Sequence, residues 1–558
     1  MDYRGSSRLW RYEPADADVV GAIERGAGVS SVMAEVLAAR GVETGAEATL
    51  FLERPREGLA DAGLLPDADA AVARVGAALD AGERIAVHGH DDADGVTAAV
   101  VMIETLVMLG ASPISYIPDR RTEGHGLNER EIARLAGDGV GLLITVDSCV
   151  SERVLIGRAR ELGIDTIVTD HHEIPAELPR AVAVIDPKRS DSLFPYPFMA
   201  GVGVALRLSD LILSRLSAAH ASPSRELVVD CERWRDEAFA LAAIGSIADR
   251  VPLTGENRIM VSEGLRAMPA TGRPGLRVLL ESAHLWGTSL RVADVREAVA
   301  PIFGRVSDGR GGNRALDLLL APRAETARRL VESLAGERAR WRQSARAAWA
   351  GAERALDEEA SSPVGILDLR VPVEVAGYVA GRAVEETGRP VVVVVRKNGE
   401  ATAEARGPSG FNFVSAFDTM ADLFLGYGGH PRAAGFSIRS DDVASFEERM
   451  RAYVDAHPPV LVPRTIEARV PLGRATPELA GELDRLAPFG EGNGPATLFS
   501  PDVAPDDIEA AKRSGLRFRT PVRLSDGSAG IVYRLRHDDG VAFASVVDRI
   551  PPGGGGAP

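Results

Sequence analysis

Between residues 84 and 185, short apolar runs alternate with longer amphipathic stretches. The runs, among them Arg84–Val87, Gly141–Val146 and Ala181–Ile185, have the length of strands, and the stretches between them, such as Gly95–Leu109, have a helical pattern. Strands that alternate with helices over short connections are typical of a parallel sheet with helices on both faces. The pattern therefore predicts an α/β domain, which we place at residues 81–320.

The rest of the chain divides into parts with other patterns. Residues 323–360 form a long helical pattern without proline, in which Glu and Arg recur at spacings of three and four. A second α/β pattern follows, with five consecutive valines at 391–395, and short β-type runs separated by turns occupy residues 464–550. We therefore expect a lead-in at 1–80, a connecting helix at 321–362, a smaller α/β domain at 363–458, a β-barrel of oligonucleotide-binding type at 459–550 and a disordered tail at 551–558.

The composition excludes several classes of protein. The two cysteines, Cys149 and Cys231, form no CxxC pair, which argues against a thiolate zinc site and against a disulfide framework. There is no run of about 18 apolar residues and no signal-peptide pattern at the N-terminus, so we expect a cytoplasmic protein without a membrane span. The formal net charge of −16 argues against non-specific adhesion to nucleic acid, although a carboxylate-rich metal site accounts for part of that charge.

Acidic and histidine residues follow several of the expected strands. The segment 88–95 contains two histidines and three aspartates. Later apolar runs are followed by Asp147, by the triplet Asp170-His171-His172 and by Asp186, and a helical stretch is followed by Asp249. A single Asp after a strand is often only a helix N-cap. In an open parallel sheet, however, the carboxyl ends of the strands share one edge, and we expect these side chains to converge there.

Such a convergence predicts a metal centre. Crowded carboxylates repel each other unless a cation lies between them, and carboxylate with imidazole ligands and no sulfur suits Mn²⁺ or Mg²⁺. The number of ligands indicates two ions. Because two ions stabilise both the attacking and the leaving oxygen of a phosphoryl transfer, the cluster indicates phosphoester hydrolysis.

The order of the motifs resembles the DHH phosphoesterase superfamily and, within it, the bacterial exonucleases that degrade single-stranded DNA from the 5′ end. The resemblance rests on the loop Asp92-Ala93-Asp94-Gly95, on Asp147 and on Asp170-His171-His172. It continues through 200–205, 244–253, the DHHA1-like Gly428-Gly429-His430 and 486–493, and so runs through most of the chain. It implies a DHH catalytic domain, a DHHA1 domain and an oligonucleotide-binding barrel.

The resemblance also implies a role for each matching residue. The implied metal ligands are His90, Asp92, Asp94, Asp147, His171 and Asp249, and the implied catalytic set is Asp92, Asp94, Asp147, His171, His172 and Asp249. Asp147 would bridge two ions, His172 would lie beside the scissile phosphate, and Asp170 would orient His171. The implied nucleic-acid contacts are Arg120, Arg310, Arg382, Arg406, Gly428, Gly429 and His430. For each arginine, a surface ion pair is the alternative.

Three places depart from the pattern of these exonucleases. His90 stands where they usually have Asp, and Asp186 stands before a proline where they often have Asn. Residues 301–310 keep little of an element that normally reads Pro-Arg-x-Asn-Ala-x-Gly-Arg. The departures leave open the metal preference, the role of Asp186 and part of the nucleic-acid groove.

We therefore expect a two-metal enzyme with Mn²⁺ or Mg²⁺ that hydrolyses single-stranded DNA in the 5′→3′ direction in DNA repair and recombination. A narrow channel between the two α/β domains would admit only single strands, and the barrel would guide the strand, with Phe489, Phe499, Phe518 and Tyr533 as stacking candidates. The alternatives are a phosphodiesterase for short oligoribonucleotides or cyclic dinucleotides, and a degenerate scaffold without catalysis. We expect a monomer, with a helicase and a single-strand-binding protein as candidate partners.

Overall fold

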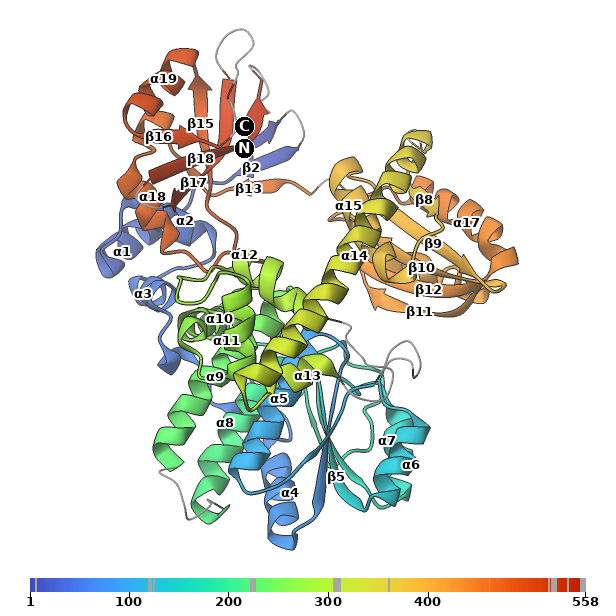
Figure 1. Ribbon diagram of the computed structural model, residues 1–558. Coiled ribbons are helices and arrows are strands. Elements are labelled where there is room, and N and C mark those ends of the chain that lie inside the picture. The colour runs from blue at the N-terminus through green and yellow to red at the C-terminus, as the bar shows by residue number, and fades with distance from the viewer. Residues whose placement is uncertain are drawn as a thin grey trace.

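The computed structural model describes residues 1–558 except 6–7, 119–122, 124–125, 221–226, 305–312, 360–361, 461, 520–521, 523–528, 539–540 and 552–558. Figure 1 shows a parallel-sheet region at the bottom, a second α/β region at the right and a β-rich region at the upper left. The expected tail lies outside the described residues, apart from Pro551.

The first region is built on a five-stranded parallel sheet in the order β4-β3-β5-β6-β7. The strands are β3 (Arg84–Gly89), β4 (Ile114–Tyr116), β5 (Val140–Val146), β6 (Asp165–Thr169) and β7 (Ala183–Ile185). The central strands β3 and β5 are buried over almost their whole length, because helices cover both faces of the sheet. This confirms the parallel sheet that the alternating sequence pattern predicts.

The helices of this region form a layer on each face. On one face, α5 (Ala93–Met108) packs against α8 (Gly201–His220) and α9 (Leu227–Asp249), and the three share a core with β3 and β5. On the other face, α6 (Glu129–Gly137) and α7 (Arg153–Glu161) bury a smaller core. The remaining helices of the region are α4 (Ala68–Ala81), α10 (Gly255–Ala267), α11 (Pro274–Ser282), α12 (Val292–Asp294) and α13 (Arg314–Leu319).

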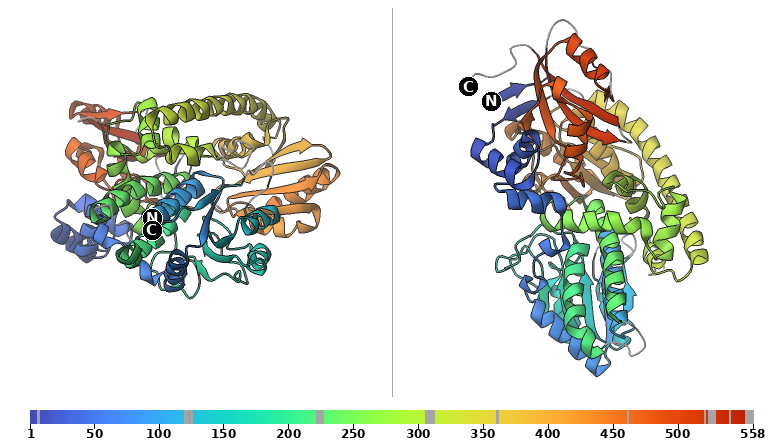
Figure 2. Two further views of the ribbon diagram at one scale, coloured as in Figure 1. Left: turned by 60° about the horizontal axis from the view of Figure 1, so that its bottom comes forward. Right: turned by 90° about the vertical axis from the view of Figure 1, so that its left-hand side faces the viewer.

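The long helix α14 (Ala324–Glu358) connects the first region to the second. Val331 and Leu334 in its first half belong to the core of the parallel-sheet region. Trp349 and Ala352 in its second half pack in a core with α15 (Val373–Thr387). The left view of Figure 2 shows the helix crossing from one region to the other, as expected of a connecting helix.

The second region contains a five-stranded mixed sheet in the order β11-β12-β10-β9-β8. Its elements are β8 (Gly365–Asp368), β9 (Val391–Lys397), β10 (Glu400–Arg406), β11 (Phe424–His430), β12 (Ala433–Arg439), α15, α16 (Phe413–Asp418) and α17 (Val443–Ala456). Helix α15 covers β9 and β10. The edge strand β11 is exposed from Leu425 to His430, so one margin of this sheet is open.

The C-terminal region is a five-stranded sheet in the order β14-β15-β17-β18-β16, consistent with the expected oligonucleotide-binding type. Its elements are β14 (Ala468–Arg469), β15 (Thr497–Val503), β16 (Leu516–Phe518), β17 (Ala529–Asp538), β18 (Val541–Ile550), α18 (Pro477–Asp484) and α19 (Pro505–Arg513). Phe499 and Tyr533 are buried in cores and therefore cannot stack on bases. Phe489 and Phe518 are half-buried and remain candidates.

The N-terminal segment packs against this C-terminal region. Strands β1 (Asp2–Arg4) and β2 (Leu9–Tyr12) form a hairpin, and β2 pairs in parallel with β13 (Arg464–Ile466). Helices α1 (Ala17–Ala27), α2 (Ser31–Ala39) and α3 (Gly45–Glu53) share a core with the C-terminal sheet. By contrast, α4 packs against the first region. The segment 1–80, which we expected to be a single lead-in, is therefore divided between two regions.

In the part of the chain that the structure describes, no helix combines the length and the apolar character that a membrane span requires.

Candidate metal centre

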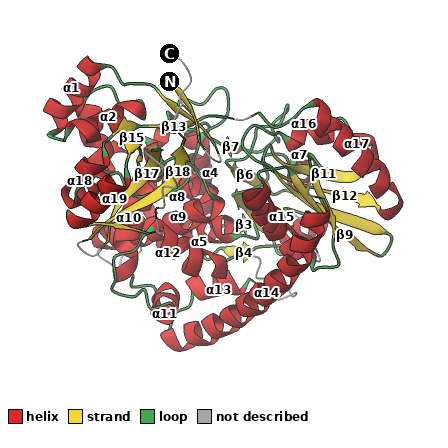
Figure 3. Ribbon diagram, turned by 90° about the horizontal axis from the view of Figure 1, so that it is seen from above, coloured by secondary structure: helices red, strands yellow, loops and turns green. Residues whose placement is uncertain are grey.

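The carboxyl ends of the parallel strands lie at one edge of the first sheet. In the view from above, β3, β6 and β7 are seen between the C-terminal region and the second α/β region (Figure 3). His90 follows the end of β3, Asp147 follows β5, and Asp170 follows β6. Asp249 is the last residue of α9. The expected convergence of strand ends is therefore present.

Two histidines each lie close to several carboxylates at this edge. His171 Nε2 lies 3.1 Å from Asp147 Oδ1, and it is 3.8 Å from Asp94 Oδ2 and from Asp249 Oδ2. His90 Nδ1 lies 2.8 Å from Asp92 Oδ2 and 3.9 Å from Asp147 Oδ2. Three groups have all their ligand atoms within 4.8 Å of one another: Asp147-His171-His172, His90-Asp92-Asp147 and Asp94-His171-Asp249. The structure thus brings all six implied metal ligands together, with Asp147 common to two groups.

The cluster has the electrostatics of a cation site. Asp94 and Asp147 are buried, and burial together with neighbouring carboxylates raises the pKa of both well above the usual range. Asp147 Oδ1 is buried and, although it lies near His171, makes no hydrogen bond among the described residues. Buried acceptors without a donor are costly, and a divalent cation would relieve both the repulsion and the missing contacts.

Glycines allow the backbone segments around the cluster to approach one another. Asp94 accepts hydrogen bonds from the backbone nitrogens of Gly201 at 2.7 Å and Val202 at 2.9 Å, at the start of α8. A Cβ on Gly201 would lie 2.5 Å from Asp147 Oδ1, and a Cβ on Gly95 would lie 2.5 Å from the His90 backbone nitrogen. Any larger residue at either position would displace a candidate ligand.

Asp170 orients His172 and not, as the resemblance implies, His171. Its Oδ1 lies 2.7 Å from His172 Nδ1, and its Oδ2 accepts a hydrogen bond from the Val150 backbone nitrogen at 2.8 Å. Burial alone would lower the pKa of His172, but the bond and charge of Asp170, with Asp249 and Asp94, raise the pKa of His172 to about 9. In the metal-free chain, these carboxylates therefore favour the protonated ring of His172.

The other polar residues near these strand ends differ in their surroundings. His88 is buried without a hydrogen-bond partner among the described residues, and burial lowers its pKa to about 3, so it is a neutral core residue. Asp186 is buried and accepts a hydrogen bond from the Lys188 backbone nitrogen at 2.9 Å. Among the described residues, it belongs to none of the three groups of candidate metal ligands.

His430 brings the second region to the metal cluster. Its ring stacks on the ring of His172, with 6.4 Å between the centroids. Gly428 and Gly429 are part of strand β11. Gly429 has φ +134, and a Cβ there would lie 2.6 Å from Ala433 O, so the strand pairing requires glycine.

The structure describes two of the four arginines that we expected to contact nucleic acid. Arg120 and Arg310 lie outside the described residues. Arg382 packs over the Trp349 ring at 4.1 Å and pairs with Glu386 at 3.2 Å, so its surroundings fit the ion-pair alternative. Arg406 pairs with Glu404 at 3.0 Å on β10.

The sequence reasoning did not identify an ion pair beside the cluster. Lys188 Nζ lies 3.0 Å from Glu173 Oε1. Burial and the charge of His172 are the larger causes that lower the pKa of His430, and the charge of Lys188 lowers it further. The charge of Lys188 also contributes to lowering the pKa of His171. The sequence does contain a signal for this pair. Lys188 is one of only three lysines in the chain, and it follows a strand of the parallel sheet.

Comparison with known proteins places the chain in a family. Residues 84–231 match the DHH family, N-terminal domain, and residues 363–456 match the DHHA1 domain. The single-stranded-DNA-specific exonuclease RecJ of Escherichia coli K12 is 31% identical over 480 residues, which cover 82% of this chain and 81% of that protein. The chain belongs to the RecJ family. RecJ of Bacillus subtilis is 30% identical and covers 90% of this chain, and RecJ of Thermus thermophilus is 35% identical and covers 78%. The matches span only 63% and 61% of those two relatives, about three fifths of their length.

Solved RecJ structures have the same fold. The crystal structure of RecJ from Thermus thermophilus in complex with Mn²⁺ has a TM-score of 0.79 at 26% identity and covers 97% of this chain and 79% of that chain. A structure of exonuclease RecJ bound to manganese covers 71% of this chain and 96% of that chain, with a TM-score of 0.59 at 31% identity. The RecJ fold therefore extends through the N-terminal, catalytic, second and C-terminal regions.

Proposed function

We propose that this chain is a metal-dependent exonuclease that hydrolyses phosphodiester bonds of single-stranded DNA from the 5′ end, in DNA repair and recombination. The observation that carries the proposal is the convergence of carboxylates and imidazoles around Asp147 and His171, facing His430 of the second region. The family supports the substrate class, because its curated members are named single-stranded-DNA-specific exonucleases. The 5′→3′ direction rests on the resemblance of the motifs alone.

The proposed cofactor is a pair of Mn²⁺ or Mg²⁺ ions. The residues that would hold them are His90, Asp92, Asp94, Asp147, His171 and Asp249. A donor set of oxygen and imidazole nitrogen without sulfur fits both ions. Related RecJ structures from Thermus thermophilus are described in complex with Mn²⁺ and with Mg²⁺. When bound, such ions polarise the phosphodiester and lower the pKa of water for attack on phosphorus.

His172 would contribute a hydrogen-bond donor to the reaction. Asp170 holds its Nδ1, which leaves Nε2 to donate a hydrogen bond to a phosphate oxygen. The stacked ring of His430 restricts the orientation of His172, so the second region helps to position the group that contacts the phosphate.

Four arginines, which we call the arginine cluster, support a path for the strand beyond the metal centre. They come from four segments of the chain: Arg8, Arg432, Arg464 and Arg534. Burial and the charges of the other three lower the pKa of Arg464. In the part of the chain that the structure describes, none of the four makes an ion pair within 4.0 Å. Cations that repel each other and lack carboxylate partners favour a polyanion such as a nucleic-acid backbone.

The proposal is tested with single strands labelled at the 5′ or the 3′ end and incubated with Mn²⁺. We expect release of the 5′ label as mononucleotide, little cleavage of duplex, and loss of activity in Asp147→Ala. Asp138→Ala is the matched control, because Asp138 is a surface residue of the same region that pairs with Arg134. Near-normal activity of Asp147→Ala would refute the assignment of the site.

The same assay decides between the proposal and its alternatives. A phosphodiesterase for short oligoribonucleotides or cyclic dinucleotides would cleave a dinucleotide faster than a long strand. The C-terminal sheet and the arginine cluster favour the long strand. A scaffold without catalysis would show no tight Mn²⁺ binding in isothermal titration. The monomeric state, the cytoplasmic location and the helicase and single-strand-binding partners remain predictions.

A further inference from the structure

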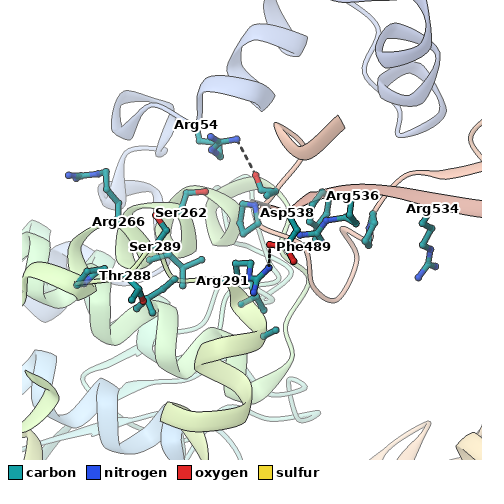
Figure 4. Close-up of a pocket in the computed structure, with 18 of the residues that line it drawn as sticks. Arg54, Ser262, Arg266, Thr288, Ser289, Arg291, Phe489, Arg534, Arg536 and Asp538 are labelled. Atoms are coloured by element: carbon teal, nitrogen blue, oxygen red, sulfur yellow. Dashed lines mark hydrogen bonds and ion pairs between the residues drawn. The ribbon is translucent and has the colours of Figure 1, made fainter. Parts of the chain in front are cut away.

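A large pocket lies between the catalytic region and the C-terminal region, and we call it the seam pocket. Its volume is about 950 Å³. One wall is formed by α10 and residues 287–293, and the other by residues 487–489, β17 and β18 (Figure 4). None of the six proposed metal ligands lines it, so it is distinct from the metal centre.

The lining of the seam pocket is strongly basic. Its arginines are Arg54, Arg266, Arg291, Arg519, Arg534 and Arg536, and its carboxylate is Asp538. Asp538 contacts Arg291 at 3.3 Å and Arg519 at 3.4 Å. Figure 4 shows the contact of Asp538 with Arg291 in the middle of the pocket. Asp538 thus lies between two guanidinium groups. Three of the arginines also pair with carboxylates outside the lining: Arg266 with Glu263, Arg291 with Asp294 and Arg536 with Asp484.

Two of the arginines have no carboxylate partner. Arg54 donates hydrogen bonds only to backbone oxygens, those of Arg485 at 3.0 Å and Ala487 at 3.1 Å. Arg534 Nε is buried without a hydrogen-bond partner among the described residues. Burial is the largest cause that lowers the pKa of both groups, and the charges of Glu263 on Arg54 and of Glu467 on Arg534 offset it only in part. An anionic ligand would supply the missing partner.

Other groups in the pocket suit the rest of a nucleotide. Arg536 lies over the Phe489 ring at 4.5 Å, which presents a planar surface to a base. Thr288, Ser289 and Ser545 offer hydroxyl groups as donors and acceptors. The volume also falls in the range of ordinary small-molecule sites, roughly 300–1,000 Å³.

We propose that the seam pocket binds the phosphate of a nucleotide without any metal ion. Two sources supply this chemistry: a free mononucleotide, which is the product class of the proposed reaction, and a nucleotide unit of a single strand. In either case the ligand joins α10 to β17, so that it holds the catalytic region against the C-terminal region. Binding at this site does not require the exonuclease activity.

Binding is measured with the full chain in EDTA, by isothermal titration and by thermal shift. The probes are deoxyadenosine monophosphate, deoxyadenosine and a single strand of about 12 nucleotides. The pocket variant is Arg519→Gln. Its matched control is Arg517→Gln, which removes the same charge two residues earlier, at an exposed position of β16 outside the pocket.

We expect at least one phosphate-bearing probe to bind the parent and Arg517→Gln equally and Arg519→Gln at least tenfold more weakly. If the mononucleotide does so, the source is free nucleotide; if only the strand does, the source is the strand. Arg534 belongs to both the pocket and the arginine cluster, so Arg464→Gln tests the cluster at a residue outside the pocket lining and should leave the affinity for the mononucleotide unchanged. Equal affinities of Arg519→Gln and Arg517→Gln for both probes, or equal binding of deoxyadenosine and its monophosphate, would overturn the proposal.

Stability provides a second readout. Because Arg534 is partly buried without an anion, the thermal midpoint of ligand-free Arg534→Gln should equal or exceed that of the parent. A lower midpoint would show that the charge is already compensated, which contradicts the inference. All these measurements are made without hydrolysis, so a failure of the seam pocket is distinguishable from a failure of the proposed exonuclease function.

Discussion

The ring of His430 lies nearly parallel to the ring of His172, with 14° between their planes. These residues belong to different α/β regions, and the edge strand that carries His430 is exposed along most of its length. The contact therefore joins the second region to the group that we expect to touch the phosphate.

Replacing His430 should impair the reaction without impairing metal binding. We expect His430→Ala to lower kcat/KM on single-stranded DNA by at least tenfold, because His172 loses the ring that limits its orientation. Mn²⁺ affinity, measured by isothermal titration, should stay at the parental value. His457→Ala is the control, since His457 is an exposed histidine of the same region that stacks on Tyr453. Unchanged kinetics in His430→Ala would remove His430 from the site.

Replacing Lys188 and replacing Glu173 should change substrate binding in opposite directions. Glu173 is 80% exposed and Lys188 only 23%, so the carboxylate is the more easily displaced partner. We expect Lys188→Met to raise KM for a single strand about tenfold and Glu173→Gln to lower it, because Glu173 competes with phosphate for the ammonium group.

Strand affinity of the Lys188 and Glu173 variants should be measured in EDTA at several salt concentrations. Lys188→Met should reduce the salt dependence of strand affinity by the amount that corresponds to about one phosphate contact. The control pair is Arg158 and Glu161, which lie on the surface of the same region at 2.8 Å. If KM changed in the same direction in Lys188→Met and Glu173→Gln, the proposed competition between Glu173 and phosphate would be contradicted.

Asp186 should make stability depend on pH. Burial, with the charge of Asp170, raises its pKa to about 7, whereas an unfolded Asp titrates near about 3.9. The folded chain therefore keeps a proton that the unfolded chain has lost. The stability that this proton contributes is fully present below about pH 4 and is lost as the pH rises through about 7.

Asp186→Asn should remove this dependence. In EDTA, we expect the free energy of unfolding of the variant to gain on the parent between pH 5 and pH 8, with a ceiling of about 2.7 kcal/mol, because pH 5 lies about two units below the raised pKa. Asp191→Asn is the control, because Asp191 is a surface carboxylate whose pKa Arg189 lowers. A constant difference between Asp186→Asn and the parent across this range would show that Asp186 is ionised when folded.

The bond between Trp10 and Asp548 should stabilise the docking of the N-terminal hairpin. The indole nitrogen donates to Asp548 Oδ2 at 2.8 Å, and both side chains are buried. We expect Asp548→Asn to cost about 2 kcal/mol of unfolding free energy and to increase hydrogen exchange in β2. Asp2→Asn, at an exposed pair with Arg11, should have little effect on either measurement. Equal exchange in both variants would show that the hairpin docks without this bond.

The sequence predicts the first region well because its pattern is local. Runs such as Leu142–Val146 are apolar throughout, since helices cover both faces of the sheet, and that alone indicates a parallel sheet. The candidate ligands then follow from topology, because residues after parallel strands must share an edge. Strand order accounts for the meeting of His90, Asp147 and His171, whereas Asp249 ends helix α9 and was assigned from the family resemblance.

Other features depend on contacts between distant segments or on rotamers. The pairing of β2 with β13 joins segments more than 450 residues apart (Leu9–Tyr12 and Arg464–Ile466), and no local pattern encodes it. Gly428 and Gly429 suggest a turn, but the pairing of β11 with β12 extends through them. Asp170 bonds His172 and not His171 because of the direction of one ring, which residue types do not reveal.

The shared core of the N-terminal helices and the C-terminal sheet has a consequence for synthesis of the chain. Ile23, Met33 and Leu37 are fully buried in that core, and the sheet that covers them ends at Ile550. A ribosome therefore exposes these apolar side chains long before their partners have been translated. The first helices to emerge are among the last to reach their native contacts, and they need protection from aggregation in the interval.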